Sequence, residues 1–424
     1  MASLSPGIII GAGVAGLSAA LAFEQAGVPY RILEAAERPG GRMLRQPHPD
    51  GGQWDVGAQF LAPPTPMLNA LLARAGLGGE LCAMPGDHAI IVDRSLHALD
   101  ARAPAALLTA RWLPRRELVL GGLSVLPQLI GSFHHGFHDY GRTARWDRPV
   151  SHRALSRLAA PVLDGVFFLD EADQSPAFTG ALFAWLLRKG RFVTVRGGLG
   201  RLPERLGPLL GVEGGVAVRS VEMRGPAEVH VSTDDRTWCA PFCVLATPAP
   251  VARALLATPT DAERALLEVT YAPTLVVAWS LREKRPVELA GRFGVLFAGS
   301  AGGLIGSLSF PATGLFAVVT AAHHAAPELS SQIDEAVEQR LRRELARHFP
   351  ALERGLGGAA VHRWAHAIPR SPVGRATAVQ DYRRSLDPAR PVRLAGDYTS
   401  FPNAESAAWT GWWSAHSLRA GGAT

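Results

Sequence analysis

Residues 8–16 read Ile-Ile-Ile-Gly-Ala-Gly-Val-Ala-Gly, and this stretch decides the fold of the chain. The three isoleucines form a β-branched apolar run that is too short for a helix, so they predict a buried strand. Helix-forming residues follow from Leu17 to a stop at Gly27, which predicts a helix. A strand, a glycine-rich turn and a helix in this order are typical of a dinucleotide-binding unit.

Each glycine of the turn has its own predicted task. Gly11 allows the tight turn after the strand, Gly13 lets a diphosphate approach the backbone, and Gly16 lets the helix pack closely against the strand. The start of the helix, which contains Ala15, presents free N–H groups and the positive end of the helix dipole to the phosphates.

A second strand and an acidic residue complete the nucleotide-binding pattern. Residues 30–33 read as a strand, and Glu34 follows directly, 23 residues after Gly11. A carboxylate about 20 residues beyond the glycine turn typically binds a ribose hydroxyl. The first forty residues therefore predict a bound dinucleotide and not an empty βαβ unit.

The residues after this carboxylate indicate which dinucleotide is bound. Ala35 comes next, and Gly41 and Arg42 then offer more backbone N–H and a fixed positive charge to the same diphosphate. This stretch resembles the FAD-binding N-terminus of the flavin amine oxidase, protoporphyrinogen oxidase and carotenoid (phytoene) desaturase superfamily. The resemblance implies FAD as the cofactor. It also implies an α/β fold, in which a Rossmann-like FAD-binding domain is combined with a discontinuous α+β substrate-binding domain.

Two further segments resemble family elements beside the isoalloxazine ring. Residues 55–58, Asp-Val-Gly-Ala, imply that the backbone of Gly57 and Ala58 passes close to the flat ring, where small residues fit. Gln59 would then lie near the reactive face of the flavin. Residues 364–369 resemble the family's Trp-x-x-Ala-x-Pro approach to the flavin, which makes Trp364 a candidate substrate contact.

The C-terminal residues resemble the second half of the family's FAD signature. A predicted strand ends in Gly396 and Asp397, and the resemblance implies that Asp397 accepts a hydrogen bond from an FAD hydroxyl on the ribityl chain. The helix that follows would direct its N-terminus, near Ser406 and Ala407, at N1 and O2 of the flavin, where negative charge collects on reduction. Trp409 in this helix is a candidate residue at the flavin face.

The middle of the chain is expected to add one more cofactor contact. Residues 215–223 read as a strand, on which Val218 resembles the family valine that touches the adenine through its backbone. Residues 203–210 predict a helix before this strand, and residues 251–267 read as a single helical stretch after it.

The remaining segments predict a second, substrate-binding domain. Residues 274–281 and 292–310 read as strands that form the floor of a pocket, and residues 334–349 read as an amphipathic helix packed on the core. The predicted division assigns residues 1–77, 195–267 and 386–424 to the FAD-binding domain, and residues 78–194 and 268–385 to the substrate-binding domain.

Composition excludes several other classes of protein. The 424 residues carry a formal charge of +6, but the basic residues are spread along the chain and form no block with interleaved aromatics, which argues against nucleic-acid binding. Three cysteines suit a reducing cytoplasm, and the N-terminus leaves no room for a signal peptide. The apolar stretch 118–130, within residues 111–133, is too short to span a bilayer, and it reads either as a pocket wall or as a peripheral membrane contact.

No catalytic metal is expected. The histidine pairs at 134–135 and 323–324 lack neighbouring Cys, Asp or Glu at the spacing that builds a closed site.

One departure from the family pattern bears on the reaction. Amine-oxidising members place a lysine on the strand beside the flavin, whereas the matching residues 271–279 contain none. This favours a dehydrogenase, oxidase or desaturase that removes hydride from a largely apolar small molecule, with O2, a quinone or another compound as the electron acceptor. A flavin amine oxidase and a non-redox flavin-dependent isomerase remain alternatives. An escort protein that has lost FAD is disfavoured by the intact cofactor residues Gly11, Gly13, Gly16, Glu34, Arg42 and Asp397.

Overall fold

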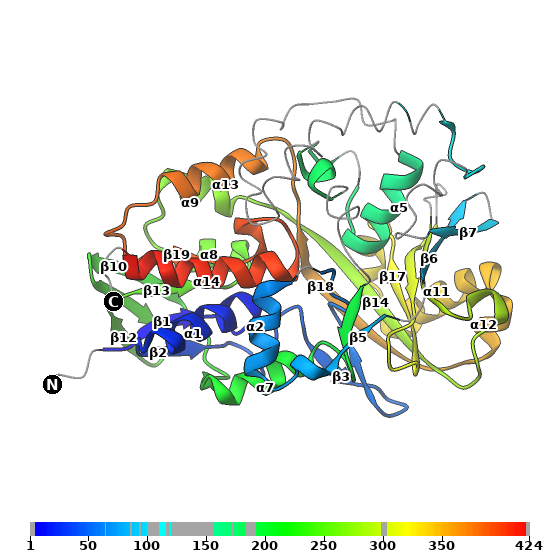
Figure 1. Cartoon of the computed structure of the whole chain (residues 1–424), viewed down its shortest axis with the longest axis horizontal. Coiled ribbons are helices and arrows are strands. Elements are labelled where there is room, and N and C mark those ends of the chain that lie inside the picture. The colour runs from blue at the N-terminus through cyan, green and yellow to red at the C-terminus, as the bar shows by residue number, and fades with distance from the viewer. Residues whose placement is uncertain are drawn as a thin grey trace.

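The computed structural model is built on two sheets that lie side by side along the long axis of the molecule (Figure 1). It describes residues 5–63, 65–84, 87–92, 95–99, 110–115, 119, 156–170, 173–175, 177–182, 192–297 and 303–420. Nearly all of the predicted membrane-contact stretch 118–130 lies outside these residues. Within the described part, no helix combines the length and the apolar character needed to cross a membrane.

The first sheet is parallel and begins with the predicted N-terminal strand. Its order is β19-β13-β1-β2-β9, and every described pairing in it is parallel. Helix α1 (Val14–Ala26) follows β1 and ends at Gly27, which has the left-handed φ of +68°. The strands are β1 (Gly7–Ile10), β2 (Tyr30–Leu33), β9 (Val212–Glu213), β13 (Cys243–Leu245) and β19 (Val392–Leu394).

Helix α14 (Ala404–Ala420) packs directly along α1, as Figure 1 shows for the red and dark blue helices. The approach is so close that a Cβ atom on Gly411 would overlap the carbonyl oxygen of Ala15. A glycine at this crossing therefore brings the two helix backbones into contact, and it joins the two ends of the sequence.

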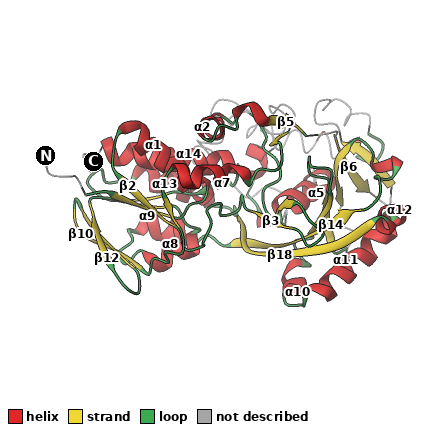
Figure 2. Ribbon diagram, turned by 90° about the horizontal axis from the view of Figure 1, so that it is seen from below, coloured by secondary structure: helices red, strands yellow, loops and turns green. Residues whose placement is uncertain are grey.

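The second sheet is larger and mixed, with the order β18-β14-β17-β16-β15-β6-β7. Its longest strands, β14 (Tyr271–Leu281) and β18 (Leu356–Pro369), run antiparallel and extend toward the first sheet (Figure 2). The other strands are β6 (Asp87–Val92), β7 (Ser95–Leu99), β15 (Arg292–Phe297), β16 (Ile305–Ser309) and β17 (Phe316–Ala321).

Helices lie on both faces of this second sheet. Helix α11 (Asp334–His348) buries Val337, Leu341 and Leu345 against one face, as its amphipathic pattern predicted. Helix α5 (Ser156–Phe167) packs over β15 and β16 on the opposite face (Figure 2). The sheet therefore has one face closed by α11 and one face shared between α5 and a cavity.

Three predicted elements have different boundaries in the structure. Residues 215–223 do not form one strand, because Gly214 and Gly215 turn the chain after β9, with φ of +70° at Gly215, and β10 (Ser220–Gly225) starts only later. The stretch 251–267 forms two helices, α8 (Ala249–Leu255) and α9 (Asp261–Leu267). Residues 292–310 form two antiparallel strands, β15 and β16, in place of one run.

The other strands form smaller two- and three-stranded sheets. The remaining strands are β3 (Arg45–Pro47), β4 (Gln53–Asp55), β5 (Leu81–Ala83), β8 (Val193–Val195), β11 (Glu228–Ser232) and β12 (Thr237–Ala240). The remaining helices are α2 (Pro66–Arg74), η1 (Gly78–Glu80), α7 (Arg201–Leu209), η5 (Val287–Leu289), α10 (Ala326–Ser330), α12 (Pro350–Arg354), α13 (Arg375–Arg384) and η6 (Asp397–Thr399).

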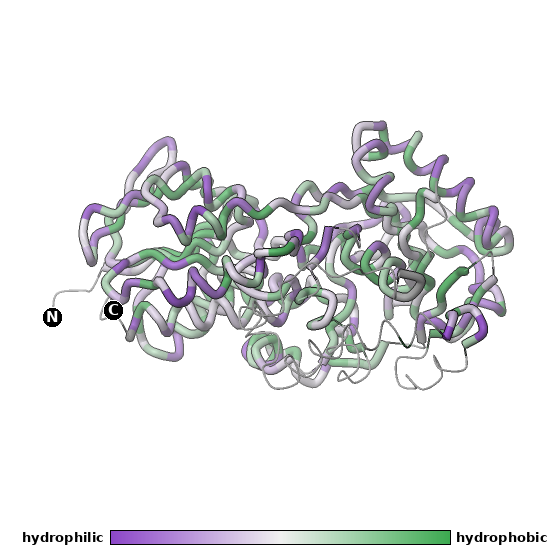
Figure 3. The backbone as a smooth tube through the Cα atoms, turned by 90° about the horizontal axis from the view of Figure 1, so that it is seen from above, coloured by the Kyte–Doolittle hydropathy of each residue, from purple (hydrophilic) through white to green (hydrophobic). Residues whose placement is uncertain are grey.

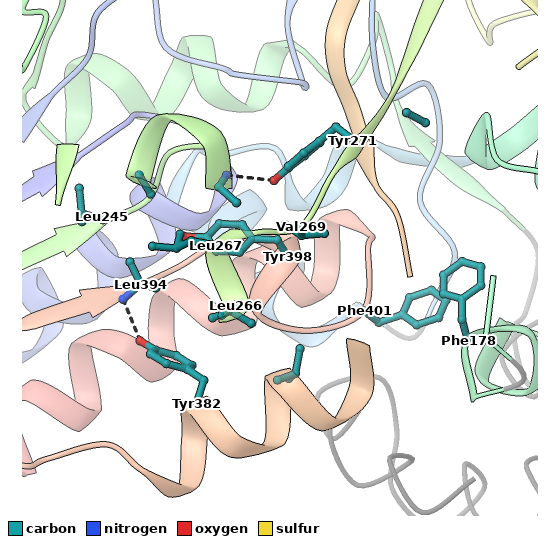
Figure 4. Close-up of a cluster of buried hydrophobic side chains, with 14 of the residues drawn as sticks. Phe178, Leu245, Leu266, Leu267, Val269, Tyr271, Tyr382, Leu394, Tyr398 and Phe401 are labelled. Atoms are coloured by element: carbon teal, nitrogen blue, oxygen red, sulfur yellow. Dashed lines mark hydrogen bonds between the residues drawn. The ribbon is translucent and has the colours of Figure 1, made fainter. Parts of the chain in front are cut away.

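Apolar side chains fill the space around both sheets. The strands at the centre of the first sheet are hydrophobic along their length, whereas α11 turns a hydrophilic face outward (Figure 3). Figure 4 shows buried tyrosines that also satisfy backbone groups: the Leu394 N–H donates to the Tyr382 hydroxyl, and the Ala249 N–H donates to Tyr271. These two hydrogen bonds thus join α13 to β19 and β14 to α8.

The strands of the first sheet come from residues 7–33, 212–245 and 392–394, and those of the second from residues 87–99, 271–321 and 356–369. Each set falls within one of the two predicted discontinuous domains, although the domain boundaries themselves remain a prediction.

Candidate functional site

A single cavity of about 610 Å³ extends from the carboxyl ends of the first sheet to the open face of the second. We call the part at the first sheet the nucleotide half and the part on the second sheet the sheet half. Cavities of this size commonly bind cofactors and their substrates together. Most of the cofactor residues predicted from the sequence line it: Gly11, Gly13, Ala15, Glu34, Ala35, Gly41, Arg42, Gly57, Ala58, Val218, Gly396, Asp397 and Ala407.

The three turn glycines differ in their surroundings. Gly11 has a left-handed φ of +99°, which the tight turn requires. A Cβ atom on Gly16 would overlap the carbonyl oxygen of Gly11, so this residue serves helix packing and does not itself line the cavity. A Cβ atom on Gly13 would meet nothing within 4 Å, which leaves open space at the helix N-terminus.

Glu34 extends its carboxylate from the end of β2 toward this turn. Its Oε2 accepts a hydrogen bond from the N–H of Ala12 at 2.7 Å, and its Oε1 accepts one from Ala36 at 3.0 Å. The two backbone donors hold the carboxylate at the cavity wall, where it still has acceptor capacity for a hydroxyl of a ligand.

Arg42 and Asp397, which the sequence analysis assigns to separate contacts with the cofactor, contact each other directly. The guanidinium donates two parallel hydrogen bonds to the Asp397 carboxylate, at 2.6 Å and 2.8 Å, and a third to the carbonyl of Ala367. The expected separate partners, a diphosphate for Arg42 and a ribityl hydroxyl for Asp397, stay predictions. The structure adds that a bidentate ion pair joins the two ends of the FAD signature at the cavity.

The N-terminus of α14 faces the cavity through Asn403, Ala404 and Ala407. The Asn403 side chain caps this helix by accepting a hydrogen bond from the Ser406 N–H at 2.7 Å. Ser406 is fully buried and does not line the cavity. The sequence had therefore located the helix terminus correctly to within one turn, but it had overlooked the residue that caps it.

Trp409 lies outside the cavity, and its predicted position at the flavin face is not what the structure shows. Its ring stacks on Trp413, with centroids 6.0 Å apart, and the guanidinium of Arg383 lies 4.8 Å from its centroid. Trp409 lies two positions after Ala407 in α14, which corresponds to a rotation of about 200° around the helix axis. Its side chain therefore points away from the helix face that carries Ala407. It is a packing residue between α13 and α14.

Gln59 and Trp364, the other two candidate reactive-face residues, do line the cavity. The indole N–H of Trp364 donates to the carbonyl of Val56 at 2.7 Å. A Cβ atom on Gly57 would overlap the carbonyl oxygen of Arg42, so its glycine is explained by backbone packing whether or not a ring lies beside it. The carboxamide oxygen of Gln59 accepts a hydrogen bond from Ser309 at 2.7 Å.

The sheet half also contains residues that no sequence pattern indicates. His88 on β6 packs against Phe60 and Phe293, with ring centroids 6.4 Å and 4.8 Å away. Ser307 and Thr320 hydrogen-bond each other at 2.7 Å across β16 and β17. Of the described residues that line this half, none is Asp, Glu, Lys or Arg, so its polarity comes from hydroxyls, amides and imidazoles.

The residues present fit a dinucleotide. The Thr247 hydroxyl lines the nucleotide half and is buried without a hydrogen-bond partner among the described residues, which marks a position that a ligand satisfies. The open space at Gly13, the α1 N-terminus and the carboxylate of Glu34 supply donors for phosphate and an acceptor for ribose.

Glu405, which also lines the cavity, ties α14 to α2. Its carboxylate accepts hydrogen bonds from the N–H groups of Met67 and Leu68, at 2.9 Å and 3.0 Å, in the first turn of α2. Burial raises the pKa of Glu405 to about 6, although the two donors oppose this shift.

One histidine pair has acidic neighbours that the sequence spacing did not reveal. Asp164, 159 residues away, lies 3.1 Å from Nδ1 of His323, and the ligand atoms of Asp164, His323 and His324 lie within 4.8 Å of one another. Asp170 contacts the other ring nitrogen of His323 at 3.4 Å. The hydrogen bond to Asp164 raises the pKa of His323. The absence of a catalytic metal stays a prediction.

The glycine turn, the Glu34 carboxylate and the cavity that they line are the features of a dinucleotide-binding site. A family model described as flavin containing amine oxidoreductase matches residues 14–412. The chain belongs to this family and is a flavin-containing oxidoreductase.

The individual proteins that resemble this chain match it either over a short segment or at low sequence identity. A phytoene desaturase (lycopene-forming) from Pseudescherichia vulneris is 39% identical over 69 residues, which are 16% of this chain and only 14% of that enzyme. Cyclohexylamine oxidase from Brevibacterium oxydans IH-35A superposes over 98% of both chains with a TM-score of 0.75 at 18% identity. A CLA-producing fatty acid isomerase from P. acnes superposes over 96% of this chain and 97% of its own, with a TM-score of 0.72 at 16% identity.

Two glycine substitutions separate ligand approach from packing. We expect Gly13→Ala to fold with unchanged thermal stability and to retain much less flavin, because its methyl group occupies only the open space at the phosphate-facing turn. Gly16→Ala should lower the melting temperature, because its methyl group overlaps Gly11. Thermal unfolding and flavin content would both be measured. Equal loss of stability in the two variants would contradict this assignment.

The buried Glu405 carboxylate predicts a pH-dependent stability. Its pKa is raised from 4.5 in the unfolded chain to about 6, so its stabilising contribution is complete below pH 4.5 and is lost as the pH rises through 6. The glutamine side chain in Glu405→Gln does not ionise in this pH range. Between pH 4.5 and 7 the variant should therefore gain about 2 kcal/mol in unfolding free energy relative to the parent protein. Urea unfolding at several pH values tests this, and parallel curves for the two proteins would refute it.

Proposed function

We propose that the chain is an FAD-dependent oxidoreductase that removes hydride from a largely apolar small molecule. The observation that carries this proposal is the continuity of the cavity from a dinucleotide turn to a sheet half without charged side chains. Bound FAD supplies the hydride acceptor at its N5 atom. O2, a quinone or another compound would then reoxidise it.

The apolar side chains that line the sheet half favour an apolar substrate. Phe60, Val276, Phe293 and Leu296 line it together with Phe168, which follows α5. An ammonium group on a substrate would find no carboxylate partner among these described residues. Burying an unpaired charge is costly. Planar or aliphatic substrates instead gain from contact with aromatic rings.

The protein's own residues supply orientation and electrostatics. Trp364 and Gln59 would position the substrate at the junction between the two halves, where both side chains are held by hydrogen bonds. The capped N-terminus of α14 directs its dipole into the cavity, where it would stabilise the negative charge of a reduced flavin. A neutral substrate requires no general base from the protein.

Two alternatives remain for the same site. The family description and cyclohexylamine oxidase favour amine oxidation, but β14 carries no lysine at the cavity. The likeness to a fatty acid isomerase supports a non-redox use of the flavin. Because one fold accommodates all these chemistries, the lining must decide between them. Location in the cytoplasm and a peripheral membrane contact remain parts of the proposal.

The substrate class is tested by anaerobic mixing of the flavin-loaded protein with three panels of compounds: apolar ring compounds, polyenes and primary amines. Apolar compounds should bleach the flavin fastest. Trp364→Ala should raise KM or lower kcat while the flavin stays bound, and Trp364→Phe should have the smaller effect because it keeps an aromatic ring. Faster bleaching by simple amines would reject the proposal, and product formed without any acceptor would indicate an isomerase.

The cofactor assignment is tested by a pair of neighbouring acids. Glu34→Ala should weaken FAD binding by about 1.5–3 kcal/mol, because it removes a charge-assisted hydrogen bond to the ribose. Glu37→Ala is the matched control, since Glu37 does not line the cavity. FAD titration of the apoproteins measures both, and unchanged affinity in Glu34→Ala would refute the assignment.

A further inference from the structure

Four hydroxyl side chains of the described residues line the floor of the sheet half, and one of them differs from the others. Ser307 is paired with Thr320, and Ser309 is paired with Gln59. Thr274 on β14 is 1% exposed, and its Oγ1 has no hydrogen-bond partner among the described residues. A buried hydroxyl without a partner is costly, which indicates that a bound group completes it.

The position of Thr274 indicates which group this is. In the β14–β18 pairing Thr274 lies directly opposite Trp364, and Trp364 is hydrogen-bonded to the carbonyl of Val56. The next residues, 57 and 58, reach back to the nucleotide half, where the Ala58 N–H donates to the carbonyl of Arg42. Thr274 therefore belongs to the row of the sheet nearest the dinucleotide turn.

The possible substrate contacts lie further across the same sheet. Ser309 and His88 are on β16 and β6, which are separated from β14 by one or more strands in the order β14-β17-β16-β15-β6. Thr274 therefore lies on a different strand of the floor from these possible substrate contacts.

We propose that the Thr274 hydroxyl hydrogen-bonds the flavin ring of bound FAD, and that Thr274 is thus a cofactor-positioning residue. This inference rests on the proposed use of FAD. The hydroxyl can donate or accept, so it can serve either a nitrogen or an oxygen at the edge of the ring. It is the one polar side chain that β14 presents to the cavity within the described residues, since its cavity neighbour Val276 is apolar.

The proposal makes two opposite predictions for one isosteric substitution. Thr274→Val removes an unpaired buried hydroxyl, so the apoprotein should melt at a higher temperature than the parent. The same variant should bind FAD about three- to tenfold more weakly, which corresponds to the loss of one hydrogen bond. Thr274→Ser should restore FAD affinity.

Thr320→Val is the matched control, because its hydroxyl is satisfied by Ser307 within the protein. This variant should lose stability in the apoprotein and keep its affinity for FAD. The measurements are thermal unfolding of the apoproteins and titration with FAD followed by quenching of flavin fluorescence, together with the visible spectrum of each reconstituted protein.

The outcomes are distinct. Unchanged FAD affinity in Thr274→Val, or an apoprotein that is less stable than the parent or does not fold, overturns the inference. Unchanged FAD affinity with weaker binding of an apolar substrate analogue assigns the hydroxyl to the substrate and likewise overturns it. If the parent protein itself binds no FAD, the proposed function fails and not this step alone.

Discussion

The architecture depends on backbone contacts that only glycine permits. Helix α1 is pressed against the β1 turn at Gly16, and α14 is pressed against α1 at Gly411. In both places a methyl group would overlap a carbonyl oxygen. Because α1 is fixed from two sides, its N-terminus at Gly13 and the N-terminus of α14 open into the same cavity. The positive ends of two helix dipoles are thereby directed into one cavity.

Charged side chains are distributed unevenly along this cavity, because they line its nucleotide half and not the described part of its sheet half. In the nucleotide half, Glu34 is held by backbone donors, and Arg42 pairs with Asp397 across the ends of the chain. The described lining of the sheet half contains no such charges. A molecule with phosphates at one end and a flat, weakly polar ring at the other matches this gradient. The ion pair also compensates the charge of the buried Asp397 carboxylate.

The sequence predicted many of the residues that line the nucleotide half, because the signals for them are local. A turn needs its glycines in order, and Glu34 follows a recognisable strand. Two predictions differ from the structure because they depend on three-dimensional geometry. The turn at residues 214–215 delays the start of the strand that was expected to contain Val218. The helical position of Trp409 in α14 directs its side chain away from the cavity. The position of His88 depends on the pairing of β6 with β15, which are about 200 residues apart, so no local pattern could reveal it.

The fold alone does not select the reaction. An amine oxidase and a fatty acid isomerase both superpose on more than nine-tenths of this chain. Hydride removal requires a C–H bond held against the acceptor, and holding depends on the shape and polarity of the floor. On this floor the polar groups are neutral and mostly paired with one another, which leaves them little to offer a charged substrate. The proposed preference for apolar substrates therefore rests on the exclusion of charged groups more than on the binding of a particular ion.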